Sequence, residues 1–167
     1  MTLYRSADTF SDRRFVISTW SSSYKNAHAA GMIASEDWPG VMHPQITKLL
    51  DRPGTRTIVA YERPSFLYGF ICGDTSGRLP VVHYVYVKGA FRAQQVAPVG
   101  EPERWSGPRH ARGLFAALGV DPAQPFLYTC KTADVVDLDI ANKIPLARFK
   151  PGAARYANYQ SHEERDR

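Results

Sequence analysis

The chain has 167 residues, of which 44% are hydrophobic and 22% are charged, and its formal net charge is +5. This length predicts one domain, which buries enough surface (roughly 70% of that of the unfolded chain) to need no disulfide or structural metal. The composition excludes wholesale disorder, and no apolar run approaches the ~18 residues of a membrane-spanning helix or resembles a signal peptide at the N-terminus.

The two cysteines, Cys72 and Cys130, both lie inside apolar, strand-like runs. We expect both to be buried, reduced thiols, as in proteins of a reducing compartment. A metal site is not expected, because the chain has no CxxC motif and no pair of histidines with ligand spacing. The histidines are His28, His43, His83, His110 and His162.

The N-terminal region predicts a short strand and then a long helix. The strand covers residues 3–5, and the helix covers residues 11–26. Within the helix, Val16, Trp20 and Tyr24 recur every four residues, which places them on one apolar face.

A second helix is predicted after a loop over residues 28–41. It opens at His43-Pro44, because proline suits the first turn of a helix, and Pro53-Gly54 stops it.

Three strands are predicted next. Residues 57–61 and 66–72 are rich in β-branched and aromatic side chains and form a hairpin, and residues 73–77 make a turn. Residues 81–87 form the strongest strand of the chain. Neither of its faces is strongly polar, which indicates a central position in the sheet.

The rest of the chain alternates irregular and regular segments. An irregular, proline-rich loop is followed by a helix that Gly119 stops, a strand, a short helix that ends at Pro145, a last strand and a polar tail. In order, these segments cover residues 96–108, 109–118, 126–130, 134–142, 146–149 and 156–167.

This order of elements predicts an α/β chain with a mixed, mostly antiparallel central sheet and helices on both faces. From about Leu3 to Phe149 it resembles the GCN5-related N-acetyltransferase (GNAT) fold. Three stretches carry the likeness: Phe66 to Ile71, Tyr84 to Arg92, and Ala111 to Leu118. The resemblance implies one domain over residues 1–155, with an insertion at about residues 95–108 and a C-terminal tail over 156–167.

The resemblance also implies a reaction and a site. GNAT enzymes transfer an acyl group from acetyl-CoA to an amine, and their pyrophosphate-binding loop after the fourth strand has the pattern Q/R-x-x-G-x-G/A. On this pattern His83 would be the general base and Tyr128 the general acid. The residues that would bind acetyl-CoA are Val87, Arg92, Gln95, Ala97 and Arg112.

The loop departs from that pattern, and the departure supports a different hypothesis. Gln95 stands where the first glycine belongs, and Pro98 has no amide hydrogen to offer a phosphate. The sequence therefore favours a non-catalytic member of the fold that binds no cofactor. Arg104, Trp105 and Arg109 would then belong to a contact surface for partners.

The stretch HYVYVK at residues 83–88 also resembles GNAT-like proteins of tailed bacteriophages. That likeness favours a virion assembly protein, which docks in several copies onto a portal or tail ring, in the host cytoplasm and then in the virion. The net charge of +5 suits acidic protein surfaces or nearby DNA, and no membrane partner is expected. The alternative is the acetyl-CoA-dependent N-acyltransferase, acting on an amine of DNA or protein.

Overall fold

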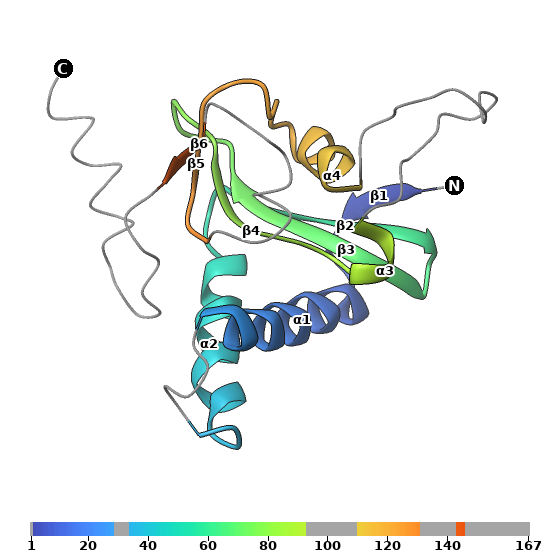
Figure 1. The fold of residues 1–167 in the computed structure, drawn as a ribbon, viewed down its shortest axis with the longest axis vertical. Helices are drawn as coiled ribbons and strands as arrows, with labels where there is room; N and C mark the ends of the chain where they lie inside the picture. Colours follow the sequence, from blue (N-terminus) through green and yellow to red (C-terminus); the bar gives the residue numbers. More distant parts are fainter. Residues whose placement is uncertain (1, 29–33, 93–109, 131–142, 146–167) are drawn as a thin grey trace, which may run out of the picture.

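The computed structural model describes residues 2–28, 34–92, 110–130 and 143–145 (Figure 1). Its helices are α1 (Phe10–His28), α2 (Trp38–Leu50), α3 (Gly89–Arg92) and α4 (His110–Leu118). Its strands are β1 (Leu3–Ser6), β2 (Thr55–Arg63), β3 (Phe66–Asp74), β4 (Val81–Val87), β5 (Phe126–Tyr128) and β6 (Lys143–Pro145).

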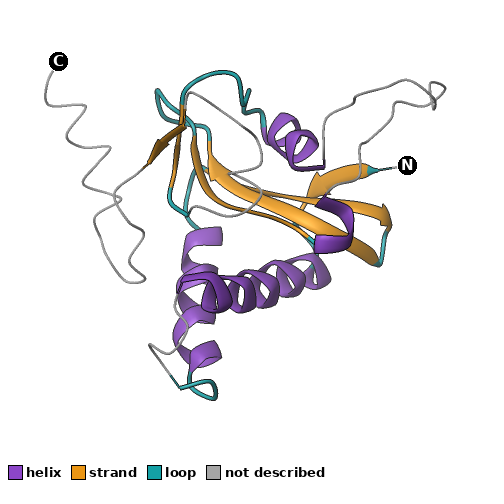
Figure 2. Ribbon diagram, viewed as in Figure 1, coloured by secondary structure: helices purple, strands orange, loops and turns teal. Residues whose placement is uncertain are grey.

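The strands form one six-stranded sheet in the order β1-β2-β3-β4-β5-β6. Strands β1 to β4 pair antiparallel with one another, whereas β5 runs parallel to β4 and β6 runs parallel to β5. Helices α1 and α2 cover one face and α4 covers the other (Figure 2). The predicted fold class, a mixed sheet with helices on both faces, is confirmed.

The core has two halves, one on each face of the sheet. On the α4 face, the apolar side of α4 packs on aliphatic residues of the sheet. On the α1 face the core is aromatic: the Trp20 and Tyr84 rings stack at 4.9 Å, and Phe70 stacks on Tyr84 at 6.0 Å. Aromatic pairs at these distances are favourable beyond their buried area, so they fix α1 against β3 and β4.

Strand β4 has the central position that its sequence predicts, between β3 and β5. From Tyr84 onward its side chains alternate between the two faces as a pleated strand requires. Val85 and Val87 belong to the core under α4, and Tyr84 and Tyr86 pack on the α1 face.

The predicted start of the second helix is wrong. Helix α2 begins at Trp38, not at His43-Pro44, so that Pro44 lies inside the helix and Pro39 occupies the first turn. Burial explains the earlier start, because Trp38 and the next two buried residues, Met42 and Ile46, recur every four residues. Their packing outweighs the backbone hydrogen bond that a proline inside a helix removes.

Several boundaries in the second half also differ from prediction. Strand β5 ends at Tyr128 and not at Cys130, and the one-turn helix α3 was not foreseen. Pro145 does not end a helix but pairs with Tyr128 in β6. A proline is tolerated there because β6 lies at the edge of the described sheet. The helix and strand predicted over 134–142 and 146–149 lie outside the described residues.

The two cysteines behave as the sequence predicts. Cys72 and Cys130 are both buried and free. Burial raises the pKa of each thiol to about 12, so both stay protonated at neutral pH. Among the described helices, none combines the length and the apolar character needed to cross a membrane.

An ion pair joins the first strand to the first helix. Arg5 donates from Nε and Nη2 to the two carboxylate oxygens of Asp12, at 3.1 and 2.8 Å. Asp12 is fully buried in the first turn of α1, where its backbone amide also donates to Thr9 Oγ1. Arg5 reaches further to Pro64 O at 2.9 Å, and its guanidinium lies 4.4 Å from the centre of the Tyr61 ring. One arginine thus links β1, α1 and the β2–β3 turn.

We predict that Asp12→Ala lowers the free energy of unfolding by about 2 kcal/mol, because it removes a buried carboxylate that accepts two charge-assisted hydrogen bonds from the partly exposed Arg5. The matched control is Asp51→Ala, which breaks the exposed ion pair between Arg13 and Asp51. This control should cost less than about 0.5 kcal/mol. Urea unfolding at pH 7 measures both. Equal losses in the two variants would show that the Arg5–Asp12 pair does not stabilise the fold.

Candidate functional site

The sheet changes from antiparallel to parallel pairing at β4. Strand β5 pairs with only Val81 and Val82, opposite Leu127 and Tyr128. Beyond this short ladder, β4 continues to Val87 while β5 has ended. Ligands of open sheets bind at the carboxyl ends of neighbouring strands where the connections diverge, so this end of β4 is the candidate site.

A β-bulge lies at the same point. On the β3 side, Cys72 pairs with Tyr84 and Gly73 pairs with Val82, so His83 is the extra residue. Gly73 makes this close approach possible, because a Cβ there would lie 2.6 Å from the carbonyl oxygen of Val81. The bulge increases the twist of β4 where it leaves β5.

Thr129 makes the last bonds between the two diverging strands. Its amide donates to Val82 O at 3.1 Å, and its hydroxyl donates to His83 O at 2.5 Å. These two bonds hold the chain after β5 beside the bulge, and they set the point of separation.

His83 is almost completely buried, with 1% of its surface exposed. Its pKa is lowered to about 4, mainly by burial and to a smaller extent by the charge of Arg52. The charge of Asp74 opposes this shift. The imidazole is therefore neutral at pH 7. Asp74 is itself buried at the end of β3, where its carboxylate accepts hydrogen bonds from the amide and hydroxyl of Ser76.

Tyr128, the predicted general acid, lies on the neighbouring strand. It pairs with Val82, one residue from His83, so the fold brings the two predicted catalytic residues to the same level of the sheet. Tyr128 is partly buried and packs against the core under α4.

A second polar cluster lies at the start of α4. The Tyr68 and His110 rings meet edge to face at 4.9 Å, and Phe91 of α3 stacks on Tyr68 at 5.0 Å. The buried Tyr68 hydroxyl has no hydrogen-bond partner among the described residues. Burial raises the pKa of Tyr68, and the neighbouring Thr2 hydroxyl partly opposes this rise. The Thr2 hydroxyl also lies 3.4 Å from His110 Nδ1, within hydrogen-bond distance.

Tyr4 of β1 completes this cluster on the α4 side. Its ring crosses α4 at Gly113, where any side chain would overlap the Tyr4 hydroxyl. Burial raises the pKa of Tyr4 to about 12, and Tyr68 adds to the shift. Gly113 is therefore explained by packing against Tyr4.

The described residues include three of the five predicted cofactor ligands. Val87 is buried at the end of β4, and Arg112 is exposed in the first turn of α4. Arg92 ends α3, with its guanidinium 5.6 Å from the centre of the Tyr86 ring, on the α1 face. The fold thus does not direct Arg92 and Arg112 to one point. Gln95 and Ala97, and the predicted contact residues Arg104, Trp105 and Arg109, lie outside the described residues.

Three residues of this region were not foreseen. Asp74 stands in a Gly-Asp-Thr-Ser-Gly stretch that predicts a turn, although the strand continues through it. Tyr68 and Thr129 lie in apolar runs that give no sign of a polar role. No sequence signal separates such residues from ordinary core or turn positions, because their role depends on the bulge and on α4.

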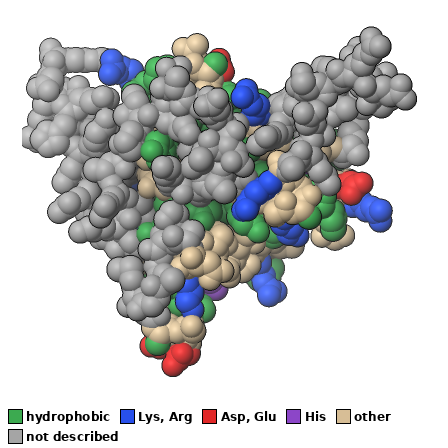
Figure 3. All heavy atoms as spheres, viewed as in Figure 1, with side chains coloured by type: hydrophobic (Ala, Val, Ile, Leu, Met, Phe, Trp, Pro, Cys, Tyr) green, Lys and Arg blue, Asp and Glu red, His purple; other side chains and the backbone are tan. Residues whose placement is uncertain are grey.

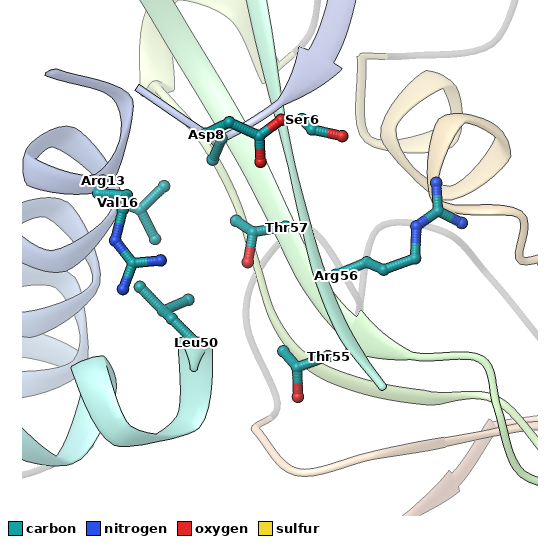
Figure 4. Close-up of a pocket in the computed structure, with 9 residues that line it drawn as sticks. Ser6, Asp8, Arg13, Val16, Leu50, Thr55, Arg56 and Thr57 are labelled. Carbon is teal, nitrogen blue, oxygen red and sulfur yellow. The ribbon is translucent and has the colours of Figure 1, made fainter. Parts of the chain in front are cut away.

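A small cavity of about 150 Å³ lies elsewhere, between β1, β2 and the ends of α1 and α2 (Figure 4). Both of the arginines that line it are already engaged. Arg13 pairs with Asp51 at 2.6 Å, and Arg56 points toward α4, where it donates to Leu118 O at 3.2 Å. This cavity is therefore a poor candidate for an anionic ligand. Within the described ranges, no cluster of three or more His, Cys, Asp or Glu side chains could hold a metal ion.

No protein-family profile matches the sequence, and no curated protein matches it. Among solved structures, a Pyrococcus furiosus protein assigned as an acetyl transferase matches at a TM-score of 0.50 and 12% identity, over 100% of this chain and 93% of that one. The chain has a GNAT-like fold.

Two other GNAT-like structures match less closely. A Clostridium acetobutylicum protein assigned as an acetyltransferase, crystallised with acetyl-CoA, has a TM-score of 0.45 and 16% identity over 95% of this chain and 88% of its own. The ribosomal-protein-alanine N-acetyltransferase of Brucella melitensis has a TM-score of 0.44 and 14% identity, over 96% and 90%.

We predict that stability falls as the pH drops from about 6.5 to about 4, because His83 gains a proton in the unfolded chain but not in the native protein. Between pH 7 and pH 5 this effect amounts to about 2 kcal/mol. His110 adds to it in the same direction, because burial lowers its pKa too.

Urea unfolding of the wild type, His83→Gln and His110→Gln at both pH values measures the two contributions separately. The pH dependence should become clearly smaller in His83→Gln. An unchanged dependence in that variant would show that His83 titrates normally in the native protein.

Proposed function

We propose that the protein is an acyltransferase that uses acetyl-CoA to acylate an amine. One observation carries the proposal: β4 and β5 are parallel, pair over two residues only, and separate at a bulge, in a sheet whose fold matches that of an assigned acetyl transferase. The separation gives a ligand access to the carboxyl half of β4 from the side of α4.

The residues at the start of α4 fit a bound coenzyme A. The amides of the first turn of a helix favour an anion, and Arg112 is exposed in that turn of this nine-residue helix. The Tyr68 hydroxyl, which is buried beside His110 and has no hydrogen-bond partner among the residues that the structure describes, is a further donor for such a ligand. Val87 would line the acyl-bearing arm. Bound acetyl-CoA would supply an activated thioester.

His83 and Tyr128 would then act as general base and general acid. A neutral imidazole can accept a proton from an incoming ammonium, but a pKa of about 4 and near-complete burial make His83 a weak base that acts through an intervening water or hydroxyl. Tyr128 is more exposed and would donate to the leaving thiolate.

This proposal reverses the order of the two hypotheses that the sequence favours. A phage assembly role for a cofactor-free scaffold remains a prediction, since neither the fold nor the structural matches point to a portal, a tail ring or a virion. On the face seen in Figure 3, the described lysine and arginine side chains are spread out and do not gather into one patch. The fold match, in contrast, is to an assigned acetyl transferase.

We predict micromolar binding of acetyl-CoA by calorimetry, weakened about tenfold by Arg112→Ala through loss of one charged contact. Arg14→Ala, which removes an exposed arginine from α1, is the matched control and should bind normally. No binding by the wild type, together with defined oligomers in light scattering, would favour the scaffold.

We also predict that His83→Gln and Tyr128→Phe each lower kcat by roughly 10²-fold, the usual effect of losing a general acid or base. The affinity for acetyl-CoA should stay within about twofold of the wild type, because neither residue is proposed to hold the cofactor. Release of free thiol from acetyl-CoA measures turnover. A kcat that is unchanged in both variants would remove both residues from the chemistry.

A further inference from the structure

An open groove of about 590 Å³ lies between α1 and β4, on the face of the sheet opposite α4. Its size falls within the range of small-molecule sites. Each described residue that lines it is polar and uncharged or aromatic: Ser18, Thr19, Ser22, Ser23, Asn26 and Tyr86. Five of these six residues come from α1, and Tyr86 comes from the half of β4 beyond the bulge.

Two of the serine hydroxyl groups of this groove are oriented by hydrogen bonds to the preceding turn of α1. Ser18 Oγ donates to Phe15 O at 3.4 Å, and Ser23 Oγ donates to Trp20 O at 3.3 Å. A serine that gives its hydrogen to the preceding turn presents oxygen lone pairs to a ligand. The groove therefore offers hydrogen-bond acceptors that carry no charge.

A hydrogen bond also connects the groove to β4, next to His83 of the candidate site. Ser23 Oγ and the Tyr84 hydroxyl are 2.8 Å apart, and since Ser23 gives its hydrogen to Trp20, Tyr84 is the donor. Tyr84 directly follows His83 in β4 and stacks on Trp20 of α1. A ligand in the groove would thus lie along the same strand as the bulge.

The absence of a carboxylate among these lining residues limits the ligand class. A site that selects a polyamine or a basic peptide needs negative charge to offset desolvation of several ammonium groups. Hydroxyl and amide groups instead match a ligand with many hydroxyl groups of its own, since Ser18 and Ser23 present acceptors, and Thr19, Ser22 and Asn26 can both donate and accept.

We propose that this groove binds the acyl acceptor, and that the acceptor belongs to the amino-sugar class. Such a molecule carries a single amino group on an otherwise uncharged, polyhydroxylated ring. The inference rests on the proposed acyltransferase function and adds the substrate class to it. The amine would lie toward β4, and the hydroxyl groups would bond along the serine face of α1.

Ligand-observed NMR with glucosamine, in the absence of acetyl-CoA, tests the groove directly. Glucosamine should bind the wild type and Ser11→Leu, which places the same side chain on α1 outside the groove. Binding should weaken about tenfold or more in Ser22→Leu and Asn26→Leu, which fill the groove with apolar atoms and remove polar contacts. Both substituted positions are exposed, so the fold should be retained, and circular dichroism checks this.

A second measurement separates this inference from the proposed function. With acetyl-CoA, glucosamine should be acylated in preference to spermidine and glutamate, and Ser22→Leu should raise KM for glucosamine without changing KM for acetyl-CoA. Absence of glucosamine binding, equal binding by all variants, or a preference for spermidine or glutamate would overturn the inference. Failure to bind acetyl-CoA would instead overturn the proposed function, whatever the NMR result.

Discussion

The two hydrogen bonds from Thr129 to β4 decide where the sheet stops being continuous. They fix the chain after β5 to Val82 and His83 and so set the length of the parallel ladder. On the other side of β4, the close approach at Gly73 accommodates the extra residue. The bulge at His83 therefore lies next to the point where β4 and β5 separate. The candidate catalytic chemistry depends on both features being at this position of the sheet.

The α1 face depends on aromatic packing in a comparable way. Trp20, Phe70 and Tyr84 stack in series, so the position of α1 follows directly from β3 and β4. This stack places the serine face of α1 beside the carboxyl half of β4. The α4 face combines mainly aliphatic contacts with a few rings and has its polar groups at the start of the helix. The two faces thus offer different chemistry to ligands that approach one strand.

Regular patterns in the sequence predicted the strands and the sheet class, because alternation and β-branched content report local pleating. The bulge at His83 could not be predicted, since it depends on Gly73 of another strand. The start of α2 was missed because Pro44 suggested a first turn, whereas burial of Trp38 governs the boundary. The resemblance named His83 and Tyr128 as candidate catalytic residues without placing them side by side, and nothing in the sequence pointed to Tyr68, whose burial depends on packing under α4.

The contact between Tyr4 and Gly113 has a consequence for tracing the ancestry of the chain. A glycine inside a helix costs about 1 kcal/mol relative to alanine, so its presence in α4 reflects the volume that the tyrosine occupies. The side chains at positions 4 and 113 would occupy the same volume, although the two positions are far apart in the sequence. Distant homologues should therefore exchange bulk between them, with a smaller residue at position 4 wherever position 113 has gained a side chain, and this paired change would remain detectable after overall identity has been lost.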